Sequence, residues 1–152
     1  MPIDELVLWL MRRWPAPFDG LTVAPPGLWH RGDETLPPMP DRAVGLTWTG
    51  GPGERSEGAL DVVSFQARVR GRASLPGDDG QRRQDSAEAL AAALDLAVLM
   101  PAPHEHLGDR TVVLTGRTGG PPAFLRRENA RLHLTGNYLL TVSRPQPARR
   151  TP

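Results

Sequence analysis

The sequence predicts a single α+β domain in which a mostly antiparallel sheet of about four strands is flanked by two helices. Two long segments, Leu60–Gly71 and Arg131–Arg144, alternate apolar and polar residues with period 2, which is typical of strands with one buried and one wet face. Two other segments, Asp4–Trp14 and Asp85–Met100, carry apolar stripes at helical spacing and are predicted to pack against that sheet.

The two predicted helices have clear ends as well as clear stripes. Acidic residues open the first helix, and Arg12 and Arg13 close it, as the helix dipole favours. Asp85 or Ser86 can cap the second helix, and prolines follow both helices. The first stripe is Ile3, Leu6, Val7, Leu10, Met11 and Trp14, and the second is Ala87, Leu90, Ala91, Leu94, Val98 and Ala97.

Each long strand segment is about twice the usual strand length. Ala43–Thr49 and Thr111–Arg117 read as two shorter strands, the first forming a hairpin with Leu60–Gly71. In the first long strand, the buried face is predicted to be Val63, Phe65, Ala67 and Val69, and the wet face Ser64, Gln66, Arg68 and Arg70. In the last strand, the buried phase is Leu132, Leu134, Tyr138, Leu140 and Val142, with His133 in the wet phase.

Glycine and proline make up 16 and 17 of the 152 residues, so long irregular loops should connect these elements. The longest loops are expected at residues 18–40, 50–58 and 74–84. We therefore expect one α+β domain over residues 1–144 and a polar C-terminal tail over residues 145–152.

The composition narrows the classes of function. The net charge of +1 gives no support to a bulk nucleic-acid or membrane-surface binder, and all 18 basic residues are arginine, a bias typical of GC-rich coding. The absence of cysteine excludes disulfides and thiolate chemistry. No apolar run is long enough to span a membrane, and the start lacks the basic residues of a signal peptide, so we expect cytoplasmic synthesis.

No pattern in the chain points to catalysis. His104-Glu105-His106 resembles a metal motif, but zinc needs three or four converging ligands, and only His30 or His133 could complete the set. The glycines of residues 116–122 lack the lysine and the helix of a phosphate loop and are interpreted as a bend. A Gly-x-Ser-x-Gly elbow is absent, so we predict no catalytic residue, no metal and no cofactor.

Two features have both a structural and a functional interpretation. Arg68, Arg70 and Arg72 line one side of a strand, where they form a solvated face, contact an acidic neighbour or bind nucleic acid. Trp29, within the loop of residues 18–40, packs over the domain's own core or contacts another subunit.

The order of several short motifs resembles a known family. The chain has Arg13-Trp14 after the first helix, then Leu28-Trp29, the LTWTGG segment at 46–51, SEG at 56–58 and FQARVRG at 65–71. AEAL at 87–90, GGPP at 119–122 and NYLL at 137–140 follow. In this order they resemble the small minor capsid or tail terminator proteins of long-tailed (siphovirus-type) bacteriophages, over nearly the whole chain.

The resemblance implies a structural protein of the virion, and it implies no catalysis and no cofactor. Tail terminators are α/β subunits that form a hexameric ring on the tail tube, stop its elongation and join the tail to the head neck. The implied partners are further copies of the chain, the tail tube protein, the neck or stopper protein and the end of the tape measure. DNA would pass transiently through the lumen. The implied location is the head-proximal end of the tail, after synthesis in the host cytoplasm.

Three other interpretations remain open from the sequence. One is another head–tail connector, such as a stopper or head-completion protein, and a tail-tube subunit is a weaker variant because it needs more strands. A metal-dependent enzyme would use His104 and His106, and a small nucleic-acid-binding module would use the strand arginines. For the ring, the predicted subunit or partner interface consists of Trp29, Glu54, Arg55, Glu57, Gln66, Arg68 and Arg70.

Overall fold

The computed structural model describes residues 2–14, 29–31, 36, 41–50, 60–73, 77, 86–101, 104–128 and 130–143. It contains two helices and seven strands in these ranges. They are α1 (Ile3–Arg13), β1 (Trp29–Arg31), β2 (Ala43–Gly50), β3 (Leu60–Arg72), α4 (Ala87–Leu99), β4 (Glu105–Leu107), β5 (Arg110–Arg117), β6 (Ala123–Glu128) and β7 (Arg131–Ser143).

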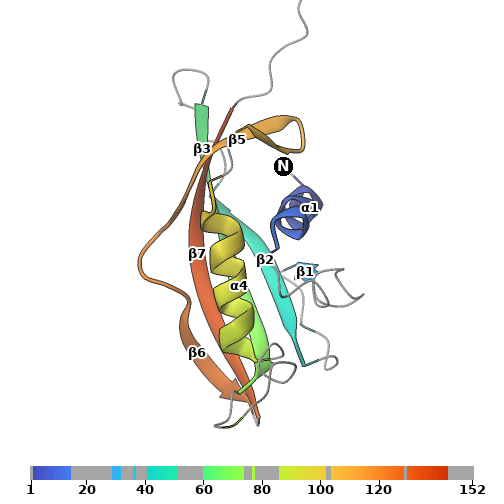
Figure 1. The fold of residues 1–152 in the computed structure, drawn as a ribbon, viewed down its shortest axis with the longest axis vertical. Helices are drawn as coiled ribbons and strands as arrows, with labels where there is room; N and C mark the ends of the chain where they lie inside the picture. Colours follow the sequence, from blue (N-terminus) through green and yellow to red (C-terminus); the bar gives the residue numbers. More distant parts are fainter. Residues whose placement is uncertain are drawn as a thin grey trace, which may run out of the picture.

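All seven strands belong to one sheet, in the order β1-β2-β3-β7-β5-β4, with β6 also paired to β7 (Figure 1). β3 and β7 form its centre and pair antiparallel over their full 13 residues, from Leu60 opposite Ser143 to Arg72 opposite Arg131. Because β3 occupies one edge of β7, β5 and β6 divide the other edge between them. Among the described strand pairs, β1 with β2 is the parallel one, and the others are antiparallel.

The predicted α+β class and the antiparallel sheet are confirmed, but the expected number of about four strands is too low. The additional strands are β1, β4 and β6. β1 and β4 have three residues each, too few to show a period of 2. All six residues of β6 are exposed, so neither of its faces carries an apolar pattern.

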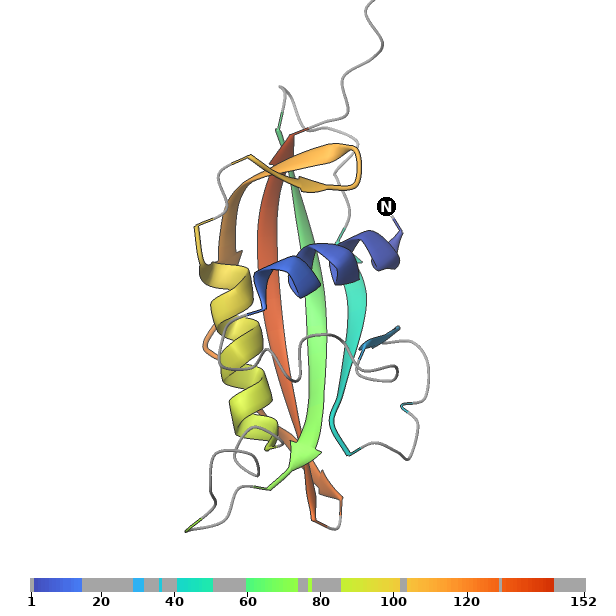
Figure 2. The same cartoon turned by 45° about the vertical axis from the view of Figure 1, so that its right-hand side comes forward.

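Both helices cover the same face of the sheet, and Figure 2 shows α1 lying across the strands while α4 runs beside β7. The largest side chains buried between the helices and the sheet include Trp9, Phe65 and Tyr138. At one end, β3 approaches α4 closely: a Cβ atom on Gly71 would lie 2.6 Å from the backbone nitrogen of Ala87. None of the described helices is long and apolar enough to cross a membrane.

The helices begin and end within two residues of their predicted bounds. Ser86 caps α4, as expected, because its hydroxyl accepts a hydrogen bond from the backbone N–H of Ala89 at 3.1 Å. The buried side of α1 differs from the predicted stripe. Trp9 and Arg13 are buried there, whereas Ile3 and Val7 are only partly buried.

The strand faces follow the predicted alternation except at two polar positions. Val63, Phe65 and Ala67 of β3 are buried, as predicted, whereas Gln66 on the opposite face is exposed. Arg70 and His133, both placed on a wet face by their phase, are instead buried, with exposed fractions of 3% and 1%. They are directly opposite each other across β3 and β7.

The burial of Arg70 has a local cause. Its Nε donates a hydrogen bond of 2.8 Å to the backbone oxygen of Asp41, just before β2. The carboxylate of Asp41 also lies 2.9 Å from Nε of Arg131. Asp41 therefore contacts both Arg70 and Arg131 at this end of the sheet. The alternation in β3 does not predict this contact, because Asp41 comes from another part of the chain.

Candidate assembly surface

One face of the sheet carries α1 and α4, and we call the opposite face the open face because no described helix covers it (Figures 1 and 2). Successive side chains along a strand point to opposite faces of the sheet. The residues that lie between the core residues of a strand are therefore on the open face. The residue pairs of β3 and β7 on this face are Leu60 and Ser143, Val62 and Thr141, Ser64 and Leu139, Gln66 and Asn137, Arg68 and Thr135, Arg70 and His133, and Arg72 and Arg131.

The open face changes in character along the strands. Near the start of β3 it is apolar, where Leu60, Val62 and Leu114 are all exposed, Leu114 by 65%. In the middle it is polar, and the amide of Gln66 donates a hydrogen bond of 3.4 Å to the side-chain oxygen of Asn137. Exposed apolar side chains gathered in adjacent rows of an uncovered sheet are typical of a contact surface.

The other end of the open face is basic. Arg68, Arg70 and Arg72 of β3 are joined there by Arg126 of β6 and Arg131 of β7, with Asp41 and Glu128 as the nearby carboxylates. Arg126 lies 3.3 Å and the Nε2 atom of His133 lies 3.5 Å from the carboxylate of Glu128. The structure thus brings the predicted strand arginines together with two arginines that the sequence alone did not connect to them.

His133 is an uncharged member of this basic cluster at neutral pH. Burial lowers its pKa below the usual value, and the positive charges of Arg126 and Arg68 lower it further. Among the described residues, neither of its ring nitrogens has a hydrogen-bond partner. Burial likewise lowers the pKa of Arg70, and the charge of Arg131 adds to this effect.

The stability of the protein should therefore fall when His133 is forced to accept a proton. The pKa of His133 is lower in the folded than in the unfolded chain. The free energy of unfolding is therefore highest above about pH 6.5 and decreases as the pH falls through that value toward the folded pKa. The loss is at most about 1.4 kcal/mol per pH unit. Urea unfolding at pH 7.5 and 5.5 should show a larger decrease for the wild type than for His133→Gln, and equal decreases would contradict the prediction.

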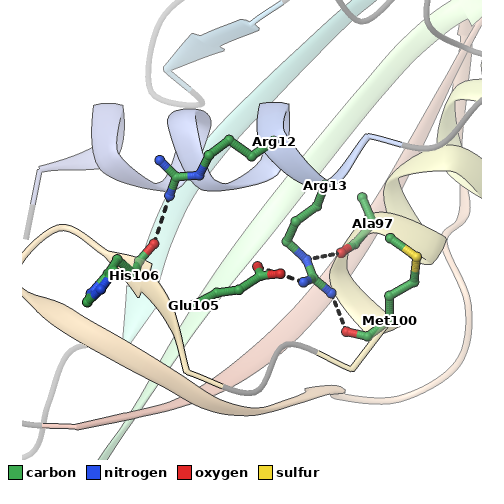
Figure 3. A network of polar contacts seen from close by, with 6 residues as sticks. All are labelled: Arg12, Arg13, Ala97, Met100, Glu105 and His106. Atoms are coloured by element: carbon green, nitrogen blue, oxygen red, sulfur yellow. Dashed lines mark hydrogen bonds and ion pairs between the residues drawn. The ribbon is translucent and has the colours of Figure 1, made fainter.

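The His104-Glu105-His106 motif serves the packing of α1. Arg13 reaches from α1 to Glu105 of β4, with Nη1 2.7 Å from the carboxylate, and Arg12 donates a hydrogen bond of 2.8 Å to the backbone oxygen of His106 (Figure 3). No group of residues suited to hold a metal occurs among the described residues. Glu105 is thus engaged in an ion pair. His104 lies in a turn and both histidines are exposed, as expected for a loop, whereas Glu105 and His106 belong to the short strand β4.

Arg13 makes further contacts that are structural. Its Nε donates to the backbone oxygen of Ala97 at 2.6 Å and its Nη2 donates to that of Met100, while its guanidinium lies 4.7 Å from the ring centre of Trp9 (Figure 3). The last turn of α4 has no basic residue of its own. Arg13 therefore supplies the positive charge that the C-terminal end of a helix favours.

The predicted interface residues have different outcomes. Gln66 is exposed and Arg68 is partly exposed on the open face, so both are available for contact. Arg70 is buried and its Nε donates a hydrogen bond to the backbone oxygen of Asp41, so its contact role stays a prediction. The backbone of Trp29 lies in β1, but its side chain is outside the described part of the structure, as are Glu54, Arg55 and Glu57.

The sequence interpretation missed β6 as a possible contact element. Phe124 and Leu125 are 63% and 50% exposed on this strand, and Arg126 and Arg127 follow them. Large apolar side chains on an edge strand are uncommon in proteins that remain monomeric. The available signal was the apolar pair Phe124-Leu125, which follows the Gly-Gly-Pro-Pro bend after one alanine, at a place where no core strand was expected.

Comparison with known proteins supports a likeness of fold. The structure is similar to a chain in a structure titled "Virion of native gene transfer agent (GTA) particle", with a TM-score of 0.50 and 17% identity. The similarity covers 91% of this chain and 93% of that chain. No protein-family model matches the sequence, and the search of curated proteins finds no match.

Proposed function

We propose that this protein is a structural subunit of a virion, and more specifically a tail terminator of a long-tailed phage or phage-like particle. The observation that carries the proposal is the fold likeness to a virion chain over nearly the full length of both chains. The order of sequence motifs, from Arg13-Trp14 to the NYLL segment at 137–140, independently resembles tail terminators.

In this role six copies form a ring at the head-proximal end of the tail tube. The ring stops elongation of the tube, contacts the tape-measure end and presents a surface to the neck or stopper protein. The net charge of +1 suits a lumen through which DNA passes without binding tightly. The role requires no catalysis and no cofactor.

The geometry of the sheet supports an assembly role. An uncovered face with exposed apolar residues at one end and arginines at the other offers two chemically distinct contact areas. A ring of identical subunits also needs two different surfaces on each copy, because each copy contacts its neighbours head to tail.

Electron microscopy of particles produced without the gene tests the proposal. Tails of variable, excessive length that are not attached to heads are the expected result. Tails of normal length beside filled, unjoined heads would instead assign the protein to the neck, as a stopper or head-completion protein. Normal, infectious particles would refute both roles, and re-expression of the gene is the control.

A further inference from the structure

In the part of the chain that the structure describes, the sheet has two open edges at the same height, one at β1 and one at β6. One row of paired residues runs through five strands, from Trp29 through Val44, Val69 and Leu134 to Phe124. The next row ends at His30 on one side and at Ala123 on the other. Among the described residues, β1 pairs only with β2 and β6 only with β7.

These two edge strands run in opposite directions. β1 is parallel to β2, and β2 runs in the same direction as β7, because both are antiparallel to β3. β6 is antiparallel to β7 and therefore to β1. When a second copy is placed beside the first in the same orientation, its β1 faces β6 of the first copy as an antiparallel neighbour.

The part of β6 at the height of β1 carries none of the charges that usually prevent edge pairing. Proteins protect edge strands with charges, prolines or covering segments. The part of β6 at the height of β1 carries Ala123 and Phe124, and the charged residues Arg126, Arg127 and Glu128 lie farther along. The bulge at Leu125, which has no partner on β7, lies between these two parts.

From these observations we infer that β6 of one subunit pairs with β1 of the next, so that the sheets of neighbouring copies are continuous around the ring. The inference rests on the proposed ring and names the interface that closes it. Pairing of β6 with β6 across a two-fold axis would end at a dimer and leave both β1 edges open, whereas pairing of β6 with β1 repeats until the ring closes.

Engineered disulfides can test this pairing because the chain has no cysteine of its own. Opposed residues in antiparallel strands have Cα atoms about 4.5 to 5.5 Å apart, within the range that a disulfide spans. The double variants His30→Cys/Ala123→Cys and His30→Cys/Leu125→Cys sample two registers. His30→Cys/Val62→Cys is the matched control, since Val62 is exposed on the open face of β3, away from both edges.

The variants are expressed in the producing host, and purified particles are mildly oxidised and analysed on non-reducing gels. At least one edge pair is expected to give a ladder of linked subunits up to the hexamer, which a reducing agent abolishes. The control pair and the single variants should remain monomeric. Particles that contain the chain without such a ladder, or dimers formed by Ala123→Cys or Leu125→Cys alone, would overturn the inferred pairing while leaving the virion role intact.

The same experiment separates the interface from the proposed function. If immunoblotting finds no chain in the particles, the virion role fails, and the edge pairing is then judged on concentrated purified protein. Linked multimers of the edge pairs, and not of the control pair, would support the pairing on its own, and their absence would refute it.

Discussion

Replacement of Arg13 by alanine is expected to lower the free energy of unfolding by about 3 kcal/mol, because it leaves buried partners without their donor. Arg13 is only 5% exposed and contacts two backbone oxygens at the end of α4, the carboxylate of Glu105 and the ring of Trp9. This loss lies at the lower end of the range for a broken buried ion pair, because Glu105 is partly exposed and water can solvate its carboxylate.

Thermal unfolding followed by circular dichroism measures this effect, and a domain of this size should lose about 6 to 12 °C in Tm. Arg12→Ala is the matched control. Arg12 is the adjacent residue on the same helix and carries the same charge, but it is exposed and donates one hydrogen bond to a backbone oxygen. Equal losses for the two variants would show that Arg13 does not fix α1 to α4 and β4.

Arg13 also shows where sequence reasoning reaches its limit. Its position in the last turn of α1 suits the dipole of its own helix, as the sequence predicts. In the structure the side chain interacts with the end of a different helix, about 84 residues away in the sequence. These groups meet only because the C-terminal ends of α1 and α4 lie side by side, and no local pattern specifies that arrangement.

The central strands were predictable because their physics is local. β3 and β7 each bury one face, so period-2 alternation marks them and nearly fixes their bounds. Arg70 and His133 depart from the pattern because Asp41 and β6, from other parts of the chain, lie against them. β6 itself is exposed throughout, and an exposed edge strand carries no hydrophobic period.

The candidate surface was predictable only in part for the same reason. Gln66 and Arg68 follow directly from the phase of β3, whereas the addition of Arg126 and Arg131 to the same basic cluster requires the pairing of β6 and β7. The contact role of Trp29, Glu54, Arg55 and Glu57 stays a prediction, since their side chains are outside the described residues. Disulfide formation by the His30→Cys double variants tests indirectly whether the β1 edge, which includes Trp29, contacts another subunit.

Phe65→Ala is expected to lower the free energy of unfolding by about 4 kcal/mol, the largest effect predicted for a single substitution here. Phe65 lies at the centre of β3 and is completely buried. Its ring stacks on Tyr138 with 5.2 Å between centroids and meets Trp48 edge-on at 6.1 Å. Removal of the ring leaves a cavity among three strands that are paired with one another and cannot easily close around it.

Phe124→Ala is the matched control, because it removes the same side chain from a strand where it is 63% exposed. Urea unfolding should show a large loss for Phe65→Ala and little change for Phe124→Ala, and comparable losses would contradict the assigned core. If Phe65→Ala does not fold, Phe65→Leu should show a smaller loss of about 1 kcal/mol. A Phe124→Ala chain that is fully stable yet fails to enter particles would separate the requirements of folding from those of assembly, since its side chain then matters only where β6 meets another molecule.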